Sequence, residues 1–202
     1  MNNVTSDFQI GISYTTDIPE EMVAGFESAI AITGLDIKSE AREVDSYAGV
    51  EWLVPTAVIV FIGKSYFDGF LKEMGKEHYH LFKKYIVTLW EHFFGQDRAV
   101  KYNRVSTKGK ILSLDKYSPI FSIMTDLLPG YRIKYLLQDD ISQAEYQNAI
   151  EEFFSFLEEL DFGVLNKNIK GQLENARSLG GIILLTYEEG ALKVLNPVSR
   201  NE

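Results

Sequence analysis

The first forty residues alternate between apolar and polar positions in a pattern that predicts a strand, a helix and a second strand. Residues 8–14 place an apolar side chain at every second position, which is the period of a half-buried strand. Asp17 is followed by a proline and two glutamates, a combination typical of a helix start, and Gly34 ends that helix. Residues 35–42 alternate again and leave one charged face. We therefore expect a strand, a helix and a strand in succession.

Two apolar patterns dominate the middle of the chain. Residues 57–62 form a short β-branched run, and a buried strand is the first interpretation. A helix continuing from Pro55 stays open, because periodicity does not separate the two for so short a run. Residues 65–94 repeat apolar side chains every three or four positions, which predicts one long amphipathic helix of about 45 Å, with a break at Gly75 left open.

Shorter elements follow toward the C-terminus. Residues 98–138 contain strand-like runs at 111–114, 120–125 and 131–137, separated by turn-like sequences, and these predict antiparallel strands. Ser142 and Glu145 form a capping box before a helix with one apolar face, and residues 167–179 predict a shorter helix. The chain then ends in a predicted β-hairpin.

These elements predict an α+β fold. We expect an antiparallel or mixed sheet, one long amphipathic helix, two to three further helices and the C-terminal hairpin. A single domain over residues 1–202 is expected, and residues 96–97 are the best candidate for a boundary within it.

Composition narrows the possible chemistry. The chain has 202 residues, of which 46% are hydrophobic and none is cysteine. Such a chain is too apolar to be disordered, and it lacks the thiols of a disulfide scaffold, a thiolate zinc site or an iron–sulfur cluster. The N-terminus has no secretory pattern, and the most apolar window, residues 53–62, is about half the length that spans a bilayer. We therefore expect a soluble cytoplasmic protein.

The net charge of −9 hides a bipolar chain. Residues 1–63 carry −8, residues 64–116 carry +5 and residues 117–202 carry −6. One interpretation is that the acidic flanks neutralise the basic middle within the fold. The other is a basic contact patch for an acidic partner, formed by Arg98, Lys101, Arg104, Lys108 and Lys110, with Tyr102 among them. One aromatic residue among these cations gives little support for nucleic-acid binding, so nucleic acid is not an expected partner.

The histidines and two short motifs give no catalytic centre. On a helix, the side chains of His78 and His80 point about 200° apart, so they cannot bind one metal ion. We expect His78 and His92 on the apolar stripe of the long helix, each buried or half-buried with one hydrogen-bond partner, and a role as ligand or general base is the alternative. Gly63-Lys64-Ser65 lacks the earlier glycine of a phosphate-binding loop, and Gly163 ends a helix. No metal or cofactor is expected.

Part of the chain resembles a TIR domain. Residues 8–15, ending in Ile12-Ser13-Tyr14-Thr15, are similar to the first strand of that family. Residues 57–62, followed by Ser65-Tyr66-Phe67 and Glu73, are similar to a later strand and to the helix with the catalytic glutamate. The resemblance covers at most the first 90 residues. It implies cleavage of NAD, with Glu73 as the catalytic acid.

Our first functional hypothesis is a non-enzymatic cytoplasmic interaction module that binds a protein partner or a second copy. No catalytic motif of specific spacing is present, whereas 13 Phe, 11 Tyr and 2 Trp supply aromatic contact groups. Trp90, Phe93 and Phe94 are the candidate docking cluster, and a corner of the protein's own core is the other interpretation. The alternatives are the NAD-cleaving enzyme and a membrane-active effector that uses residues 53–71, although a membrane is not an expected partner.

Overall fold

The computed structural model describes residues 8–31, 35–43, 56–70, 76–95, 116–178 and 180–196. Its strands are β1 (Ile10–Thr15), β2 (Ile37–Arg42), β3 (Val58–Ile62), β4 (Tyr117–Thr125), β5 (Arg132–Gln138), β6 (Ile182–Glu188) and β7 (Ala191–Leu195). Its helices are α1 (Glu20–Ile30), the π-helix η2 (Tyr66–Phe70), α3 (Lys76–Thr88), α4 (Trp90–Phe93), α5 (Gln143–Asp161) and α6 (Lys167–Glu174). The mixed sheet and its helices confirm the α+β class.

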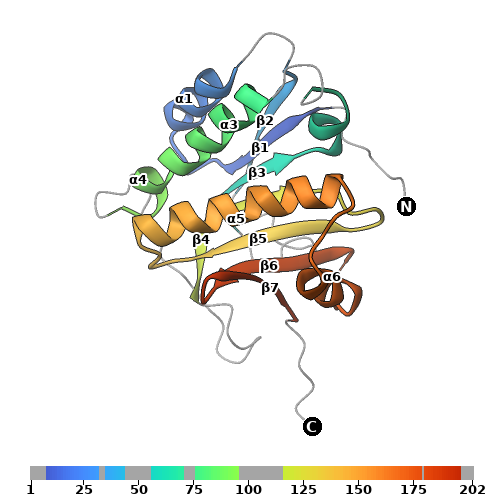
Figure 1. Ribbon diagram of the computed structural model, residues 1–202. Helices are drawn as coiled ribbons and strands as arrows, with labels where there is room; N and C mark the ends of the chain where they lie inside the picture. The colour runs from blue at the N-terminus through green and yellow to red at the C-terminus, as the bar shows by residue number, and fades with distance from the viewer. Residues whose placement is uncertain are drawn as a thin grey trace.

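The seven strands form one sheet in the order β2-β1-β3-β4-β5-β6-β7. The pairs β1/β2, β3/β4 and β5/β6 are parallel, and helices lie between the two strands of each pair in the sequence. The pairs β1/β3, β4/β5 and β6/β7 are antiparallel. The sheet is thus built from three successive β–helix–β units and a final edge strand, with the helices on one face (Figure 1).

The apolar run at residues 57–62 forms a strand, which confirms the first interpretation. β3 pairs with β1 on one side and β4 on the other, and Val58, Ile59, Val60 and Ile62 are buried. A strand covered on both faces needs apolar side chains at consecutive positions, and this explains the missing alternation. Residues 58–62 of the segment proposed for membrane contact thus lie within the sheet, between β1 and β4. Among the described residues, no helix is long and apolar enough to cross a bilayer.

The prediction of one long helix over residues 65–94 was wrong. The described parts of this segment are η2, α3 and α4, and residues 71–75, including Gly75, lie outside the described residues. α3 ends where the Thr88 hydroxyl donates a hydrogen bond to the carbonyl of Tyr85 at 2.7 Å. The N–H of Leu89 donates to the carbonyl of Ile86, three residues earlier, at 3.2 Å, whereas an α-helix would use the carbonyl four residues earlier. At the end of α3, the Thr88 hydroxyl thus bonds to a backbone carbonyl that would otherwise accept a helical N–H.

The larger core lies between the helices and the sheet, and tyrosine hydroxyls hold α5 inside it. The Tyr135 ring of β5 stacks on Phe153 of α5 with ring centroids 4.2 Å apart, and its hydroxyl donates to the carbonyl of Ala149 at 2.8 Å. The Tyr146 hydroxyl of α5 donates to the carbonyl of Ile86 in α3, also at 2.8 Å. These buried hydroxyls are satisfied by backbone acceptors, so α5 is fixed to both β5 and α3.

A smaller core occupies the opposite face of the sheet. Its buried side chains are Ile59, Tyr117, Met124, Leu136, Ile182 and Leu184. Both faces of the central strands are therefore apolar. The predicted boundary at residues 96–97 and the predicted strand at 111–114 lie outside the described residues.

Candidate functional site

The longest helix, α5, divides sharply into a buried face and an exposed face. Its capping box is present as predicted: the Ser142 hydroxyl accepts from the N–H of Glu145, and the Glu145 carboxylate accepts from the N–H of Ser142. Seven residues of α5 are buried, and aromatic rings make up more than half of them: Tyr146, Ala149, Ile150, Phe153, Phe154, Phe156 and Leu157. Because the sheet and α3 take these side chains, the acids of α5 are left on the outer surface.

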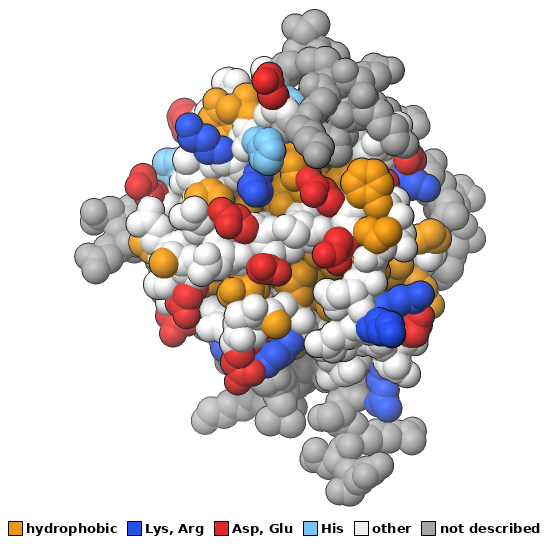
Figure 2. All heavy atoms as spheres, viewed as in Figure 1, with side chains coloured by type: hydrophobic (Ala, Val, Ile, Leu, Met, Phe, Trp, Pro, Cys, Tyr) orange, Lys and Arg blue, Asp and Glu red, His pale blue; other side chains and the backbone are white. Residues whose placement is uncertain are grey.

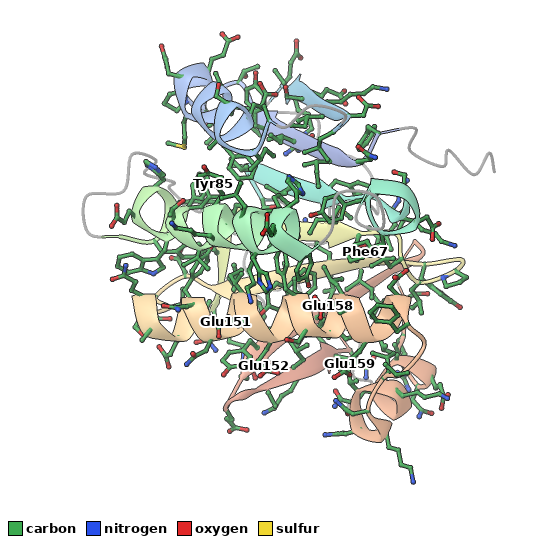
Figure 3. The ribbon with its side chains drawn as sticks, turned by 45° about the horizontal axis from the view of Figure 1, so that its top comes forward. Phe67, Tyr85, Glu151, Glu152, Glu158 and Glu159 are labelled. Carbon is green, nitrogen blue, oxygen red and sulfur yellow. The ribbon has the colours of Figure 1, made fainter. Side chains whose placement is uncertain are left out.

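Four glutamates around Ser155 form what we call the acidic face: Glu151, Glu152, Glu158 and Glu159. Glu152 and Glu159 lie on the edge of α5 toward α6 and β7, whereas Glu151 and Glu158 lie nearer α3 (Figure 3). α5 contains no Lys or Arg, and among the described residues none of the four carboxylates forms an ion pair with a basic side chain. Acidic side chains are correspondingly prominent on the helical side of the molecule (Figure 2).

The environment of Glu158 differs from that of the others. The Tyr79 hydroxyl of α3 donates to the carbonyl of Phe154 at 2.5 Å. Burial, and after it the charge of Glu158, raises the pKa of the Tyr79 hydroxyl, which stays protonated. The α3 edge of the acidic face is thus attached to the core of the protein.

The C-terminal end of α5 presents two apolar side chains to solvent. Gly163 has a φ of +69°, and the N–H groups of Gly163 and Val164 bond to the carbonyls of Leu160 and Glu159 at 3.2 and 2.8 Å. This confirms Gly163 as a helix-terminating glycine. Phe162 and Val164 are 73% and 64% exposed, and we call this pair the apolar corner. A helix cap fixes its backbone, so the two side chains project from a rigid base.

A groove of about 120 Å³ lies beside the acidic face, where α5, α6 and β7 meet. Glu152 and Glu159 form part of its wall, and Phe156, Ile169 and Leu192 supply apolar lining. The backbone N–H of Asn166 donates to the Glu159 carboxylate at 3.3 Å and so helps to hold it in place. The groove is smaller than the roughly 300–1,000 Å³ typical of small-molecule and cofactor sites.

The aromatic residues selected from the sequence pack within the fold. Phe93 stacks on Phe121 of β4 at 5.0 Å between ring centroids, and Phe94 meets the same ring edge-on at 6.4 Å. Trp90 is half-buried, and its Nε1–H donates to the carbonyl of Ile141 at 3.0 Å. These contacts correspond to the other interpretation of the cluster, a corner of the core.

The remaining residues selected from the sequence lie outside the described residues. They are the candidate catalytic acid Glu73 and the candidate contact residues Arg98, Lys101, Tyr102, Arg104, Lys108 and Lys110. Their proposed roles stay predictions.

The histidines occupy two different environments. His78 is 4% exposed, and its Nδ1 lies 3.2 Å from the Tyr66 hydroxyl, which confirms a buried histidine with a hydrogen-bond partner. Burial lowers the pKa of His78. His80 is exposed, and His92 is also exposed instead of buried, since Phe93 and Phe94 are the neighbouring side chains that pack into the core. Within the described ranges, no group of three or more His, Cys, Asp or Glu side chains could hold a metal ion.

No sequence pattern predicted the buried polar cluster on the face of the sheet opposite the helices. Lys134 of β5 is 1% exposed, and burial together with the charge of Arg42 lowers its pKa to about 7. Arg42 donates to the carbonyl of Thr56 at 3.1 Å, and the hydroxyls of Thr56 and Ser122 lie 2.7 Å apart. The only sequence signal was one lysine inside a strongly apolar strand, a pattern that predicts a solvent-facing position.

Comparison with protein-family models, with curated proteins and with solved structures finds no match to this chain. The acidic face, the apolar corner and the groove next to them are the surface features on which a function can be argued.

Proposed function

We propose that the protein is a non-enzymatic, cytoplasmic interaction module that docks a protein partner through the apolar corner and the acidic face. The exposure of Phe162 and Val164 on a capped helix end is the observation that carries this proposal. Large apolar side chains that project singly are common on protein surfaces. Two at one helix end, beside carboxylates that have no basic partner among the described residues, resemble an interface anchor with a charged rim.

The energetics favour a localised contact. Burying one large apolar side chain contributes about 1.5–3 kcal/mol, and the fixed backbone around Gly163 reduces the entropy lost when the contact forms. Glu158, Glu159 and Asp161 border the corner in sequence, so the partner surface should combine an apolar pocket with basic residues. Such charges act mainly on the association rate and on the choice of partner.

The test compares two pairs of substitutions at exposed apolar residues. Phe162→Ser with Val164→Ser removes the apolar corner, while Leu81→Ser with Tyr131→Ser removes exposed apolar side chains elsewhere. In cross-linking followed by affinity capture, the first pair should abolish capture of a partner that wild type and the second pair retain. Light scattering identifies a second copy as the partner if the first pair alone dissociates an oligomer. A strict monomer that captures no protein, or equal loss in both pairs, would refute the proposal.

A further inference from the structure

The groove between α5, α6 and β7 has the size of a single side chain. Its volume of about 120 Å³ exceeds the space that one water molecule needs, and it lies below the range of small-molecule sites. It opens on the outer surface beside the acidic face. The occupant that fits is therefore one long side chain from another molecule.

The walls of the groove specify the chemistry of that side chain. Phe156 and Ile169 are buried, and Leu192 is half-buried, so they offer an apolar surface to an aliphatic stem. Glu152 and Glu159 are seven residues apart on one edge of α5, about 10 Å along the helix axis, and neither has a basic partner among the described residues. An aliphatic stem that ends in a cation matches both parts of the wall.

The surface next to the groove suits the main chain of a peptide. A shallow hollow shares Asn168 with the groove and is also lined by Lys167, Gln172, Asn175 and Asn196. Carboxamide side chains both donate and accept hydrogen bonds, as backbone N–H and C=O groups require. This surface of carboxamides and one cation, Lys167, favours a peptide segment over a free polyamine, which has no carbonyl groups to accept hydrogen bonds from it.

We propose that the groove binds a single lysine or arginine side chain of a protein partner. The stem lies against Phe156 and Leu192, the cation lies between Glu152 and Glu159, and the partner's main chain passes over the amide-lined hollow. The inference rests on the proposed interaction function, because it assigns the basic side chain to the docked partner.

The test titrates the full chain with three five-residue peptides while amide chemical shifts are followed by NMR. The peptides carry arginine, lysine or norleucine between paired glycines, with blocked ends. The arginine or lysine peptide should give saturable shifts at Ile169, Gly190 and Leu192, and the norleucine peptide should bind about tenfold more weakly or less. The first two peptides distinguish the two basic side chains.

Matched variants separate the groove from the general field of the helix. Glu152→Gln with Glu159→Gln should weaken binding of the basic peptides by about tenfold or more. Glu151→Gln with Glu158→Gln removes the same charge from the same helix outside the groove, and should change the affinity by less than about twofold. If the first pair fails to fold, Glu152→Gln alone is used, since Glu152 is exposed.

Three results would overturn the inference: equal binding of the norleucine peptide, equal loss in both variant pairs, or the lack of any saturable shift. These results are distinguishable from failure of the proposed function. If the Phe162→Ser, Val164→Ser variant loses partner capture but the wild-type chain binds none of the peptides, the groove proposal is refuted and the interaction function is not. Peptide binding by a chain that captures no protein refutes the interaction function and leaves the groove's chemistry intact.

Discussion

Lys134 should make the stability of this protein rise between pH 7 and pH 9. The side chain lies in the interior of the sheet, where Lys134 pairs with Met124 of β4 and Leu184 of β6. Its pKa is about 7 in the folded protein, compared with 10.5 for an unperturbed lysine. Between these values the unfolded chain binds a proton that the folded chain lacks. Raising the pH across this interval therefore increases the free energy of unfolding.

The magnitude follows from the two pKa values. A difference of one bound proton changes the free energy of unfolding by about 1.36 kcal/mol per pH unit. From pH 7, where the folded amine is half protonated, to pH 9, where it is neutral, the gain is about 2 kcal/mol. Burial raises the pKa values of the Tyr66, Tyr117 and Tyr146 hydroxyls above 10, so these groups do not titrate in this interval.

Urea unfolding followed by circular dichroism at pH 7, 8 and 9 measures the effect. Lys134→Met removes the titrating amine, and its free energy of unfolding should rise by about 2 kcal/mol less than that of wild type over the interval. Lys84→Met, at an exposed position of α3, is the matched control and should follow wild type. Parallel curves for wild type and Lys134→Met would refute the assignment of a depressed pKa to this lysine.

The remaining predictions concern other parts of the fold and the alternative of NAD cleavage. Burial lowers the pKa of His78, so just below pH 6.5 this histidine gains a proton in the unfolded chain but not in the folded chain. The melting temperature of wild type should therefore fall as the pH is lowered. His78→Gln should make that fall smaller, whereas His80→Gln should not. Gly163 has a φ of +69°, so Gly163→Ala should lower the free energy of unfolding by about 1 kcal/mol. Gly25 lies inside α1 with open space around it, so Gly25→Ala should raise that free energy by up to about 1 kcal/mol. Urea titrations measure both changes. Incubation with NAD should give no turnover; turnover that disappears in Glu73→Ala would establish the enzyme instead.

The sequence predicted an element correctly where residues close together in the chain determine that element. The capping box fixed the start of α5, and the apolar run at residues 57–62 identified β3, because each signal lies within a few residues of its consequence. The long helix was mispredicted because the signal that ends α3 is not visible in the apolar spacing. Apolar spacing continues across Thr88, but the spacing does not show that the Thr88 hydroxyl binds a backbone carbonyl. Lys134 was missed because alternation along one strand carries no information about what covers each face of the sheet.

The surface features depend on contacts between distant parts of the chain. The sequence of α5 contains no Lys or Arg, but the groove exists only because β7 and α6 pack beside Glu152 and Glu159. The sequence identified Gly163 as a helix end and gave no measure of how far Phe162 projects from it. The fold then limits the partner. Helices cover one face of the sheet, and the core takes the aromatic side of α5, so the proposed partner would meet carboxylates on α5, and a basic surface would match them.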